Sequence, residues 1–323
     1  MKRIRTAVIG IGYLGKYHAE KYARLPQSEL VALCDIDHER CLTQAKALGV
    51  EAIADYRSLV NRIDAVSIVV PTLLHYTVGR FFLENGIHVL MEKPITTTLE
   101  EADELIALAK NNKVILQVGH LERFNNAIRA IEPRISKPLF IESVRLAPFK
   151  LRGSDVNVVL DLMIHDIDII QSLVRSDIKH IAANGASILT PYIDIANARI
   201  EFANGCVANI TASRVSLKTE RKLRIFQHDT YVATDLDNKK ISIHRKGTRE
   251  MCPGIPEIVS EETAFDKGDA LYDQIDSFLN AILHKKPSVV SGEDGRRALA
   301  IALEISLIVR RTNERHQLPE IVA

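Results

Sequence analysis

Cysteine is scarce in this sequence, with four residues in a chain of 323. These residues lack the close paired spacing that a zinc site requires. So few cysteines in a chain of this size also exclude a scaffold held together by disulfides, which favours a reducing cytoplasm. The four are Cys34, Cys41, Cys206 and Cys252.

A charge excess and long apolar stretches are missing as well. The 42 Lys and Arg residues balance 41 Asp and Glu residues, and the charges are interspersed. Without a strong overall field, we expect no binding to nucleic acid or to an anionic membrane. No stretch approaches the ~18 apolar residues that a membrane helix needs. Glycines break the apolar run behind the basic start, so we expect a soluble globular protein without a signal peptide.

Short apolar runs alternate with helical patterns in the first part of the chain. This order is typical of a parallel sheet with crossover helices. The expected strands are residues 5–11, 29–36, 64–71, 88–93 and 114–120. The expected helices are residues 14–25, 38–49, 75–86 and 98–112. We therefore predict a doubly wound, dinucleotide-binding domain over residues 1–120.

Longer runs with a period near two follow after this first domain. They indicate a largely antiparallel, open sheet with one polar face. The expected strands are residues 139–148, 178–189, 195–203, 206–216, 222–236 and 239–245, and two helices at 269–286 and 292–314 close the chain. We predict a second α/β domain over residues 121–323, which makes the fold class α/β with one parallel and one mostly antiparallel sheet.

A glycine-rich loop lies between the first expected strand and the first expected helix. In Gly10-Ile-Gly12-Tyr-Leu-Gly15, Gly10 permits a tight turn and Gly12 lets the backbone approach a pyrophosphate. Gly15 allows the helix to pack closely on the strand, and the helix N-terminus attracts the anion. We expect Tyr13 and Leu14 to contact the cofactor too. A simple strand–helix turn is the alternative.

Asp35 supports the dinucleotide interpretation. It lies 20 residues beyond Gly15, at the end of the second expected strand. A carboxylate there can accept hydrogen bonds from an adenosine ribose. Asp35 and Asp37 would repel a 2′-phosphate, so NAD is favoured over NADP, although Arg40 leaves room for NADP. The alternative is an aspartate that caps the next helix.

A charged pair and a proline follow the fourth expected strand. Strands of such a sheet deliver side chains to a ligand crevice at their carboxyl ends, so Lys93 should project toward the nicotinamide. Glu92 can hold the ammonium group, and Pro94 keeps the preceding residue extended. A surface ion pair that ends a strand is the alternative.

Asp161 and His165 supply the acid–base chemistry that an alcohol dehydrogenase needs. They are spaced i, i+4 on an expected helix and therefore share one face. The histidine can accept the proton released when an alcohol becomes a ketone. The ammonium group of Lys93 would stabilise the developing alkoxide. Asp168 on the same face raises a metal site as an alternative, but solvated or capping aspartates are the more ordinary interpretation, and we predict no metal.

Three more residues are candidates for the substrate side. His120 ends an expected strand, and Gly119 before it permits close approach of a ligand. Lys150 and Arg152 lie on a glycine-containing loop that suits an anionic substrate. A structural histidine and a solvated loop are the alternatives.

Five motifs occur in an order that resembles the glucose–fructose oxidoreductase, inositol dehydrogenase and rhizopine-catabolism family of dehydrogenases. The motifs are "GIGYLG", "PTLLH", "MEKP", "VGHLERFN" and "DLMIHDID", and the segment "VVSGEDGRRALAIALEIS" resembles the family's closing helix. The resemblance implies an N-terminal Rossmann domain that binds NAD(P) and a C-terminal α/β domain. It also implies oxidation of a sugar or polyol hydroxyl, and assembly into a homodimer or homotetramer through the open sheet.

By position, the resemblance implies a role for several residues. Lys93 would contact the reacting hydroxyl, and Asp161 and His165 match the family's Asp-x3-His pair, with His165 as the general base. Pro71 and His75 match a segment near the nicotinamide half of the cofactor. Family members often have a glycine between the aspartate and the histidine. The chain has the triplet 162–164, Leu-Met-Ile, instead, which predicts a more helical segment and a narrower pocket.

The substrate follows from the same resemblance. Arg123 and Asn125 match positions at the domain junction that line the substrate side. The segments "VGHLERFN" and "VVSGEDG" most resemble members that oxidise the 3-hydroxyl of UDP-N-acetylglucosamine. The alternatives are a dehydrogenase of a free sugar or inositol, and a regulator of the family that binds the cofactor without turnover.

Overall fold

The structure is a computed structural model that describes residues 3–151, 153, 156–266 and 268–316. Its contacts divide the chain into two compact units. The first unit runs to Leu121 and also includes Asp269–Leu299. The second unit comprises Glu122–Gly268 and continues from Ala300. Each unit has its own sheet.

The first unit contains a six-stranded sheet in the order β3-β2-β1-β4-β5-β6, and all neighbouring strands are parallel. The order reverses between β1 and β4, which is where such sheets bind ligands at their carboxyl ends. This confirms the doubly wound sheet predicted from the sequence. The strands are β1 (Ile4–Ile9), β2 (Ser28–Cys34), β3 (Glu51–Ile53), β4 (Ala65–Ile68), β5 (His88–Glu92) and β6 (Leu116–Gly119).

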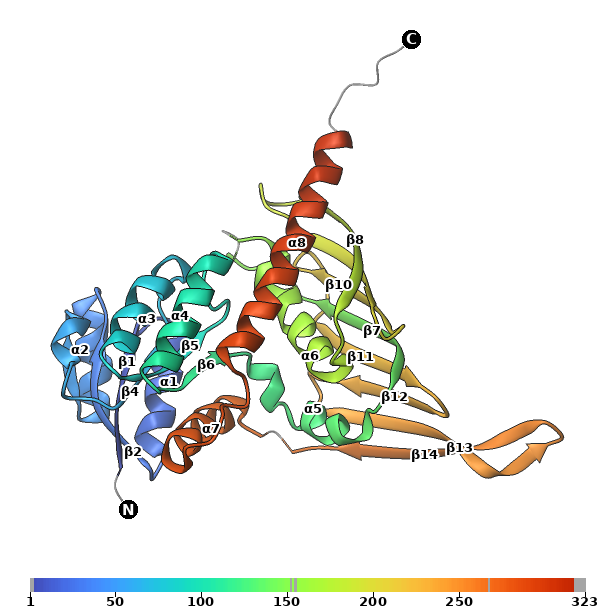
Figure 1. Cartoon of the computed structure of the whole chain (residues 1–323), viewed down its shortest axis with the longest axis horizontal. Coiled ribbons are helices and arrows are strands. Elements are labelled where there is room, and N and C mark those ends of the chain that lie inside the picture. Colours follow the sequence, from blue (N-terminus) through green and yellow to red (C-terminus); the bar gives the residue numbers. More distant parts are fainter. Residues whose placement is uncertain (1–2, 152, 154–155, 267, 317–323) are drawn as a thin grey trace, which may run out of the picture. The chain divides into compact units, whose positions relative to one another are not determined.

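Helices flank this sheet (Figure 1). They begin and end where the sequence places caps. The side chain of Asp37 caps α2, Gly49 ends that helix in the left-handed region, and Thr98 and Glu101 form a capping box at the start of α4. The crossover helices are α1 (Tyr13–Arg24), α2 (His38–Leu48), α3 (His75–Glu84) and α4 (Leu99–Asn111).

Helix α7 (Ala270–His284) also packs in the first unit, although it lies far along the chain. Its Ile275, Phe278 and Leu279 are fully buried in one apolar cluster with Val8 and Tyr22. From the sequence alone, this helix is expected in the second domain, because it follows the second sheet. Burial of its apolar face against α1 instead joins it to the first unit.

The second unit contains an eight-stranded sheet in the order β14-β13-β12-β11-β7-β10-β9-β8. Strands β7 and β10 are parallel, and the other neighbouring pairs are antiparallel, which confirms the predicted mostly antiparallel sheet. The strands are β7 (Pro138–Leu146), β8 (Ile178–Ala186), β9 (Ile195–Phe202), β10 (Val207–Ser213), β11 (Glu220–Gln227), β12 (Thr230–Asp235), β13 (Lys240–Cys252) and β14 (Ile255–Ala264).

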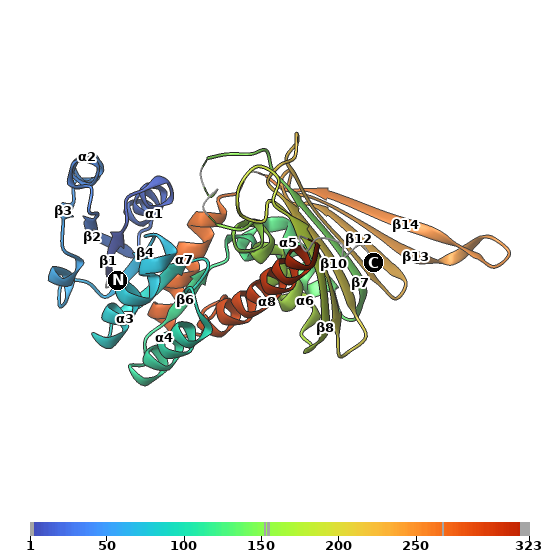
Figure 2. The same ribbon diagram turned by 90° about the horizontal axis from the view of Figure 1, so that it is seen from above.

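One face of this sheet is covered by helices, as Figure 2 shows for α5 (Asn126–Ile131) and α6 (Ile164–Val174). Alternate residues of β9 are buried on that side, and the residues between them face outward. Helix α8 (Gly292–His316) begins in the first unit and continues into the second. The hairpin of β13 and β14 extends past the neighbouring strands (Figure 2).

Among the helices of the described residues, none has both the length and the apolar character that a membrane span requires.

The capping box of α4 generates a stability prediction. Thr98→Ala removes the acceptor for the backbone N–H of Glu101, so we expect the free energy of unfolding to fall by about 1 kcal/mol. Thr43→Ala is the matched control, because Thr43 lies within α2 and its hydroxyl donates to the carbonyl of Glu39. Alanine favours a helix interior, so this control should change stability little. Urea denaturation measures both, and equal losses would contradict the role of the cap.

Candidate active site

The glycine loop at the carboxyl end of β1 is closed on one side and open on the other. A Cβ atom at Gly10 would lie 2.5 Å from the carbonyl oxygen of Val69, and one at Gly15 would lie 1.8 Å from that of Gly10. Gly10 also has a φ of +90°, a conformation that favours glycine. At Gly12, by contrast, no heavy atom of the described residues beyond its chain neighbours lies within 4 Å of such a Cβ. The loop is therefore open at Gly12.

The first turn of α1 has properties that suit an anion. Gly12 is the N-cap residue, and within the described part of the chain no side chain caps the helix there. The first turn has no acidic residue either. Its backbone N–H groups and the positive end of the helix dipole can therefore meet a pyrophosphate. Of the two other loop residues, Tyr13 is 59% exposed and Leu14 is half-buried.

Asp35 joins the glycine loop to the turn after β2. Its carboxylate is 7% exposed and accepts hydrogen bonds from the backbone N–H of Ile11 at 2.5 Å and of Asp37 at 2.8 Å. The guanidinium group of Arg40 donates to the same carboxylate at 2.9 Å and lies 3.4 Å from Asp37. Arg40 is thus neutralised by two carboxylates, which weakens its ability to hold a 2′-phosphate. The contact of Asp35 with a ribose stays a prediction.

Glu92 explains why a buried strand ends in charged residues. Its carboxylate contacts Nε2 of His18 at 3.2 Å, and Nδ1 of His18 contacts the hydroxyl of Ser67 at 3.1 Å. Ser67 also bonds the hydroxyl of Tyr22 at 2.9 Å. Burial by itself would raise the pKa of Glu92, but the hydrogen bond with His18 and the charges of His18, Lys93 and His75 hold this pKa below its usual value. The end of β5 is thereby tied to α1 and β4.

His75 fixes the backbone directly after Lys93. Its Nδ1 lies 2.8 Å from the carbonyl oxygen of Pro94, and its Nε2 lies 3.0 Å from that of Val70. The ring is 1% exposed, and burial lowers its pKa while the two carbonyls and Glu92 oppose that shift. A neutral imidazole has one N–H and can donate to one of the two carbonyls at a time. The ring connects the loops after β4 and β5, and the Lys93–Pro94 peptide in the second of these loops is cis.

His75 is buried and contacts the carbonyls of these two loops. Pro71, which was also predicted to lie near the cofactor, is exposed. Pro71 precedes the short 3-10 helix Thr72–Leu74. Contact of either residue with the cofactor stays a prediction. His120 follows Gly119 at the end of β6 and is fully buried. A Cβ at Gly119 would lie 2.7 Å from Glu92, so β6 approaches the Glu92 carboxylate closely.

In the second unit, Asp161 and His165 lie on one helical segment, which begins as a π-helix and continues as an α-helix. Asp161 belongs to a π-helical turn (Val159–Met163), and His165 belongs to the first turn of α6. The sequence predicted a regular α-helix here. Just before this turn, the side chain of Asn157 accepts a hydrogen bond from the N–H of Leu160 and also donates to Ser306 on α8, a tertiary contact. Such π-turns are common at functional sites.

Buried ion pairs hold α6 to the sheet. Arg145 on β7 donates to Asp166 at 2.6 and 3.2 Å and to Glu122 at 2.9 Å. The hydroxyl of Ser143 donates to Asp166 at 2.8 Å. This network is not among the contacts expected from the sequence. An available signal was the inward-facing position of Arg145 in the alternating strand pattern.

The same network involves residues that the resemblance assigned to the substrate side. Arg123 pairs with Asp168 at 3.6 Å, and Asn125 caps α5 and donates to Glu122 and to the carbonyl of Leu236. Asp168 is thereby part of an ion pair. No group of three or more acidic, His or Cys residues in the described ranges has an arrangement that could hold a metal. A substrate contact of Arg123 or Asn125 stays a prediction.

The remaining predicted residues are divided between the units. Lys93 and His120 belong to the first unit, and Asp161 and His165 belong to the second. Lys150 is exposed. Arg152 lies outside the described residues. The meeting of Lys93 and His165 at one substrate therefore stays a prediction.

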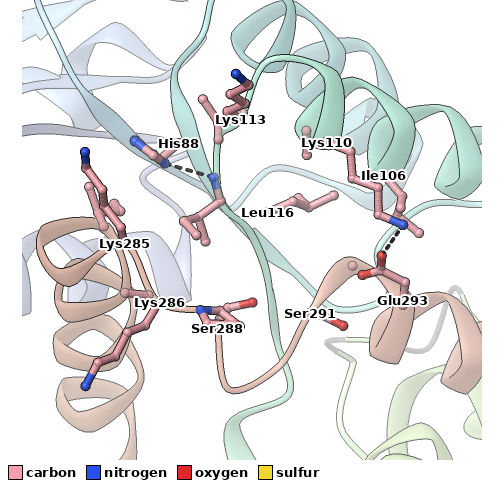
Figure 3. A pocket seen from close by; sticks show the side chains of 17 residues that line it. His88, Ile106, Lys110, Lys113, Leu116, Lys285, Lys286, Ser288, Ser291 and Glu293 are labelled. Atoms are coloured by element: carbon pink, nitrogen blue, oxygen red, sulfur yellow. Dashed lines mark hydrogen bonds and ion pairs between the residues drawn. The ribbon is translucent and has the colours of Figure 1, made fainter.

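A pocket of about 690 Å³ in the first unit lies at the end of the parallel sheet where β5 and β6 begin, opposite the end that carries the glycine loop (Figure 3). It is lined by the first residues of β5 and β6, His88 and Leu116, whereas the glycine loop follows the last residue of β1. Its lysines come from the ends of α4 and α7, where cations complement the helix dipoles, and Lys110 pairs with Glu293 at 2.7 Å. The pocket is therefore separate from the predicted cofactor site.

Comparison with known proteins matches both parts of the chain. Residues 4–120 match the GFO/IDH/MocA oxidoreductase family with an NAD-binding Rossmann fold, and residues 147–230 match the GFO/IDH/MocA C-terminal domain. UDP-N-acetylglucosamine 3-dehydrogenase of Acidithiobacillus ferrooxidans is 39% identical over 310 residues, which are 96% of this chain and 98% of that protein. A solved structure of that enzyme covers 96% of this chain and 99% of its own, with a TM-score of 0.91.

Inositol dehydrogenases are also similar. The scyllo-inositol 2-dehydrogenase (NAD(+)) of Bacillus subtilis is 32% identical over 233 residues, which are 66% of this chain and 68% of that protein. A structure of scyllo-inositol dehydrogenase from Lactobacillus casei with bound NAD(H) and scyllo-inositol shares the fold, with a TM-score of 0.80 at 21% identity over 96% of this chain and 98% of that one. This chain therefore belongs to the GFO/IDH/MocA family of NAD-binding oxidoreductases.

Proposed function

We propose that this enzyme oxidises the 3-hydroxyl of a UDP-linked amino sugar, UDP-N-acetylglucosamine, to the ketone with NAD. The observation that carries this proposal is the 39% identity to the Acidithiobacillus enzyme over 96% of the chain, since it spans both units. The exposed Lys150 supports an anionic substrate such as a nucleotide diphosphate sugar.

The residues of this chain supply the cofactor site and the acid–base groups. Backbone N–H groups at the start of α1 would hold the pyrophosphate, and Asp35 would accept the ribose hydroxyls. NAD, when bound, accepts the hydride. His165 takes the hydroxyl proton, Asp161 orients the substrate or the imidazole, and the ammonium group of Lys93 stabilises the alkoxide that forms. Alcohol oxidation requires these three functions together.

The contacts around Lys93 support its role. Catalysis requires that a charged group is already positioned before the reaction begins. Glu92 and His75 hold the strand end and the backbone on either side of Lys93. A surface ion pair that merely ended the strand would not need a buried hydrogen-bond chain to a helix and a neighbouring strand.

A second candidate substrate is an inositol or a free sugar. The 32% identity to the Bacillus subtilis scyllo-inositol 2-dehydrogenase favours it, because that likeness covers about two thirds of both chains. Both candidates use the same hydroxyl chemistry, so they differ in what the second unit recognises around the reacting carbon.

We also propose that the enzyme is a cytoplasmic homodimer or homotetramer joined through the open sheet. The outer face carries a ladder of rings across four strands: Phe140, Phe226, Tyr231 and His244, with ring centroids 5.8, 4.7 and 5.5 Å apart. Phe226 is 38% exposed. Apolar rings on an outer sheet face fit a partner surface. The cysteines are free thiols, which supports a reducing compartment.

The proposed reaction is tested by NADH absorbance in the presence of UDP-N-acetylglucosamine, inositols and free sugars. We expect turnover of the nucleotide sugar by the wild type. Lys93→Met and His165→Ala should each lower kcat by about 10²–10⁴-fold, because each removes a group that acts in the transition state. Both variants should still bind NAD.

Lys286→Met serves as the control, since it removes an exposed lysine of the same unit away from the glycine loop. It should retain wild-type kcat. Turnover of an inositol with none of the nucleotide sugar would replace the substrate assignment, and full activity of the Lys93 variant would contradict the proposed mechanism.

Cofactor choice is tested at Asp35. Asp35→Asn removes the negative charge that repels a 2′-phosphate and releases Arg40, so the preference for NAD over NADP should fall by roughly tenfold, which corresponds to about 1.4 kcal/mol. The double variant Asp35→Asn/Arg40→Ala should lose much of the gained NADP affinity. Dissociation constants for both dinucleotides measure this, and an unchanged ratio in the single variant would exclude Asp35 as the selecting residue.

The Glu92 interaction predicts a pH dependence of stability. Its pKa is lower in the folded protein than the usual 4.5, so its stabilising contribution is present above that value and is lost as the pH falls through the folded-state pKa. The difference in unfolding free energy between wild type and Glu92→Gln should therefore shrink as the pH falls below about 4.5. Urea denaturation across this range measures the difference, with the exposed Glu262→Gln as control. A difference that grows toward low pH would show that the sign is wrong.

A further inference from the structure

A buried ion pair in the second unit lies next to the segment that carries Asp161. Arg214 follows the last residue of β10 and is 4% exposed, and Asp194 precedes β9 and is fully buried. Nε of Arg214 lies 3.5 Å from Asp194, a distance that fits an ion pair without an aligned hydrogen bond. The backbone N–H of Arg214 also donates to the carbonyl of Asp194 at 2.9 Å. These contacts involve neither Asp161 nor His165.

Asp194 organises the loop that precedes it. Its carboxylate accepts hydrogen bonds from the backbone N–H groups of Ile188, Leu189 and Thr190 at 2.7–2.9 Å. The hydroxyl of Thr190 donates to the other oxygen at 2.8 Å. A carboxylate with this many donors can remain charged although it is buried. It therefore supplies a fixed negative charge for Arg214.

Arg214 organises the loop before the π-turn. Its guanidinium group donates to the backbone carbonyls of Gly153 and Val156, and to that of Ile193 at 3.2 Å. The first two carbonyls belong to the segment before Asp161, and the third belongs to the Asp194 loop. The planar guanidinium group thus joins two loops through several N–H donors. The ammonium group of a lysine lacks this fixed fork of donors and would join them less well.

Gly153 transmits this arrangement to Asp161. It has a φ of +77°, and a Cβ atom built there would lie 3.0 Å from a carboxylate oxygen of Asp161. The backbone of Gly153 therefore lies directly against that carboxylate. The carbonyl of the same residue is the one that Arg214 holds.

We propose that Arg214 is a positioning residue, which sets the Asp161 carboxylate in place through the backbone of Gly153, with Asp194 as its charge partner. The proposal rests on the proposed function for the catalytic role of Asp161, and it adds a residue that touches neither substrate nor cofactor. A displacement of about 1 Å in a reacting group can cost on the order of 10²-fold in rate. Loss of Arg214 should therefore lower kcat and leave the cofactor site in the first unit unchanged.

The experiment compares Arg214→Met, Arg214→Lys and Gly153→Ala in the full chain. We expect Arg214→Met and Gly153→Ala to lower kcat for the sugar by about tenfold or more, with the dissociation constant for NAD within about twofold of wild type. Arg214→Lys keeps the charge beside Asp194 but not the planar fork, so it should recover part of the rate. If Arg214→Met does not fold, the other two variants decide.

Ile243→Ala is the control for a purely structural effect. Ile243 is buried on β13, which β12, β11 and β7 separate from β10 in the sheet. The cavity that this substitution leaves should destabilise the second unit without displacing the backbone of Gly153. An equal loss of kcat in this control, at matched melting temperature, would overturn the proposal.

A second measurement does not depend on turnover. In protein labelled with carboxyl-¹³C aspartate, the Asp161 signal is the one that disappears in Asp161→Asn. We expect its chemical shift at constant pH to change in Arg214→Met and Gly153→Ala and to stay at the wild-type position in Ile243→Ala. An unchanged chemical shift in both folded test variants would overturn the proposal. If the wild type oxidises no sugar, the proposed function fails, and this signal still decides the positioning role.

Discussion

The hydrogen bond between Glu92 and His18 is the constraint on which the first unit's candidate site depends. It joins the end of β5 to α1, the helix whose start forms the glycine loop, and Ser67 extends the connection to β4. A mostly buried carboxylate is costly unless partners satisfy it, and the contact with His18 supplies such a partner to Glu92. The glycine loop, which we propose binds the pyrophosphate, and the segment that carries Lys93 are consequently joined by direct contacts.

The second unit uses buried charges in a similar way. Arg145 holds Asp166 and Glu122, and Arg214 holds two loops together with Asp194. Replacing such pairs by apolar residues often costs no stability, so their presence is weak evidence for a stabilising role. Asp166 directly follows His165, and Arg214 holds the carbonyls of Gly153 and Val156, which precede Asp161 in the chain. We propose that both arrangements fix the orientation of this segment.

The sequence predicted those features that local patterns determine. The glycine loop, the parallel strands and the capping box of α4 follow from residue types at fixed spacing, and the structure has them. Strand β14 was missed because most of its residues are exposed and one is a proline, so it has no apolar alternation to detect. Its position comes from backbone pairing with β13. The three-residue β3 is too short for a periodic signal.

Other features depend on contacts between distant parts of the chain. The π-turn that contains Asp161 follows Asn157, which contacts Ser306, and α7 joins the first unit by burying Phe278 beside Val8. The buried pairing of Arg214 with Asp194 likewise requires knowledge of which strands are neighbours. Residue types alone could identify Lys93, Asp161 and His165 as candidates. They could not show which side chains hold these residues in place.

In the proposed reaction, an ammonium group from the first unit and an imidazole from the second act on one hydroxyl. A crystal structure of the full chain with NAD and UDP-N-acetylglucosamine tests it most directly. We expect Nζ of Lys93 and a ring nitrogen of His165 both to lie within about 2.6–3.2 Å of the sugar's 3-hydroxyl oxygen. A complex in which the sugar is bound beside the nicotinamide while either group faces elsewhere would contradict it.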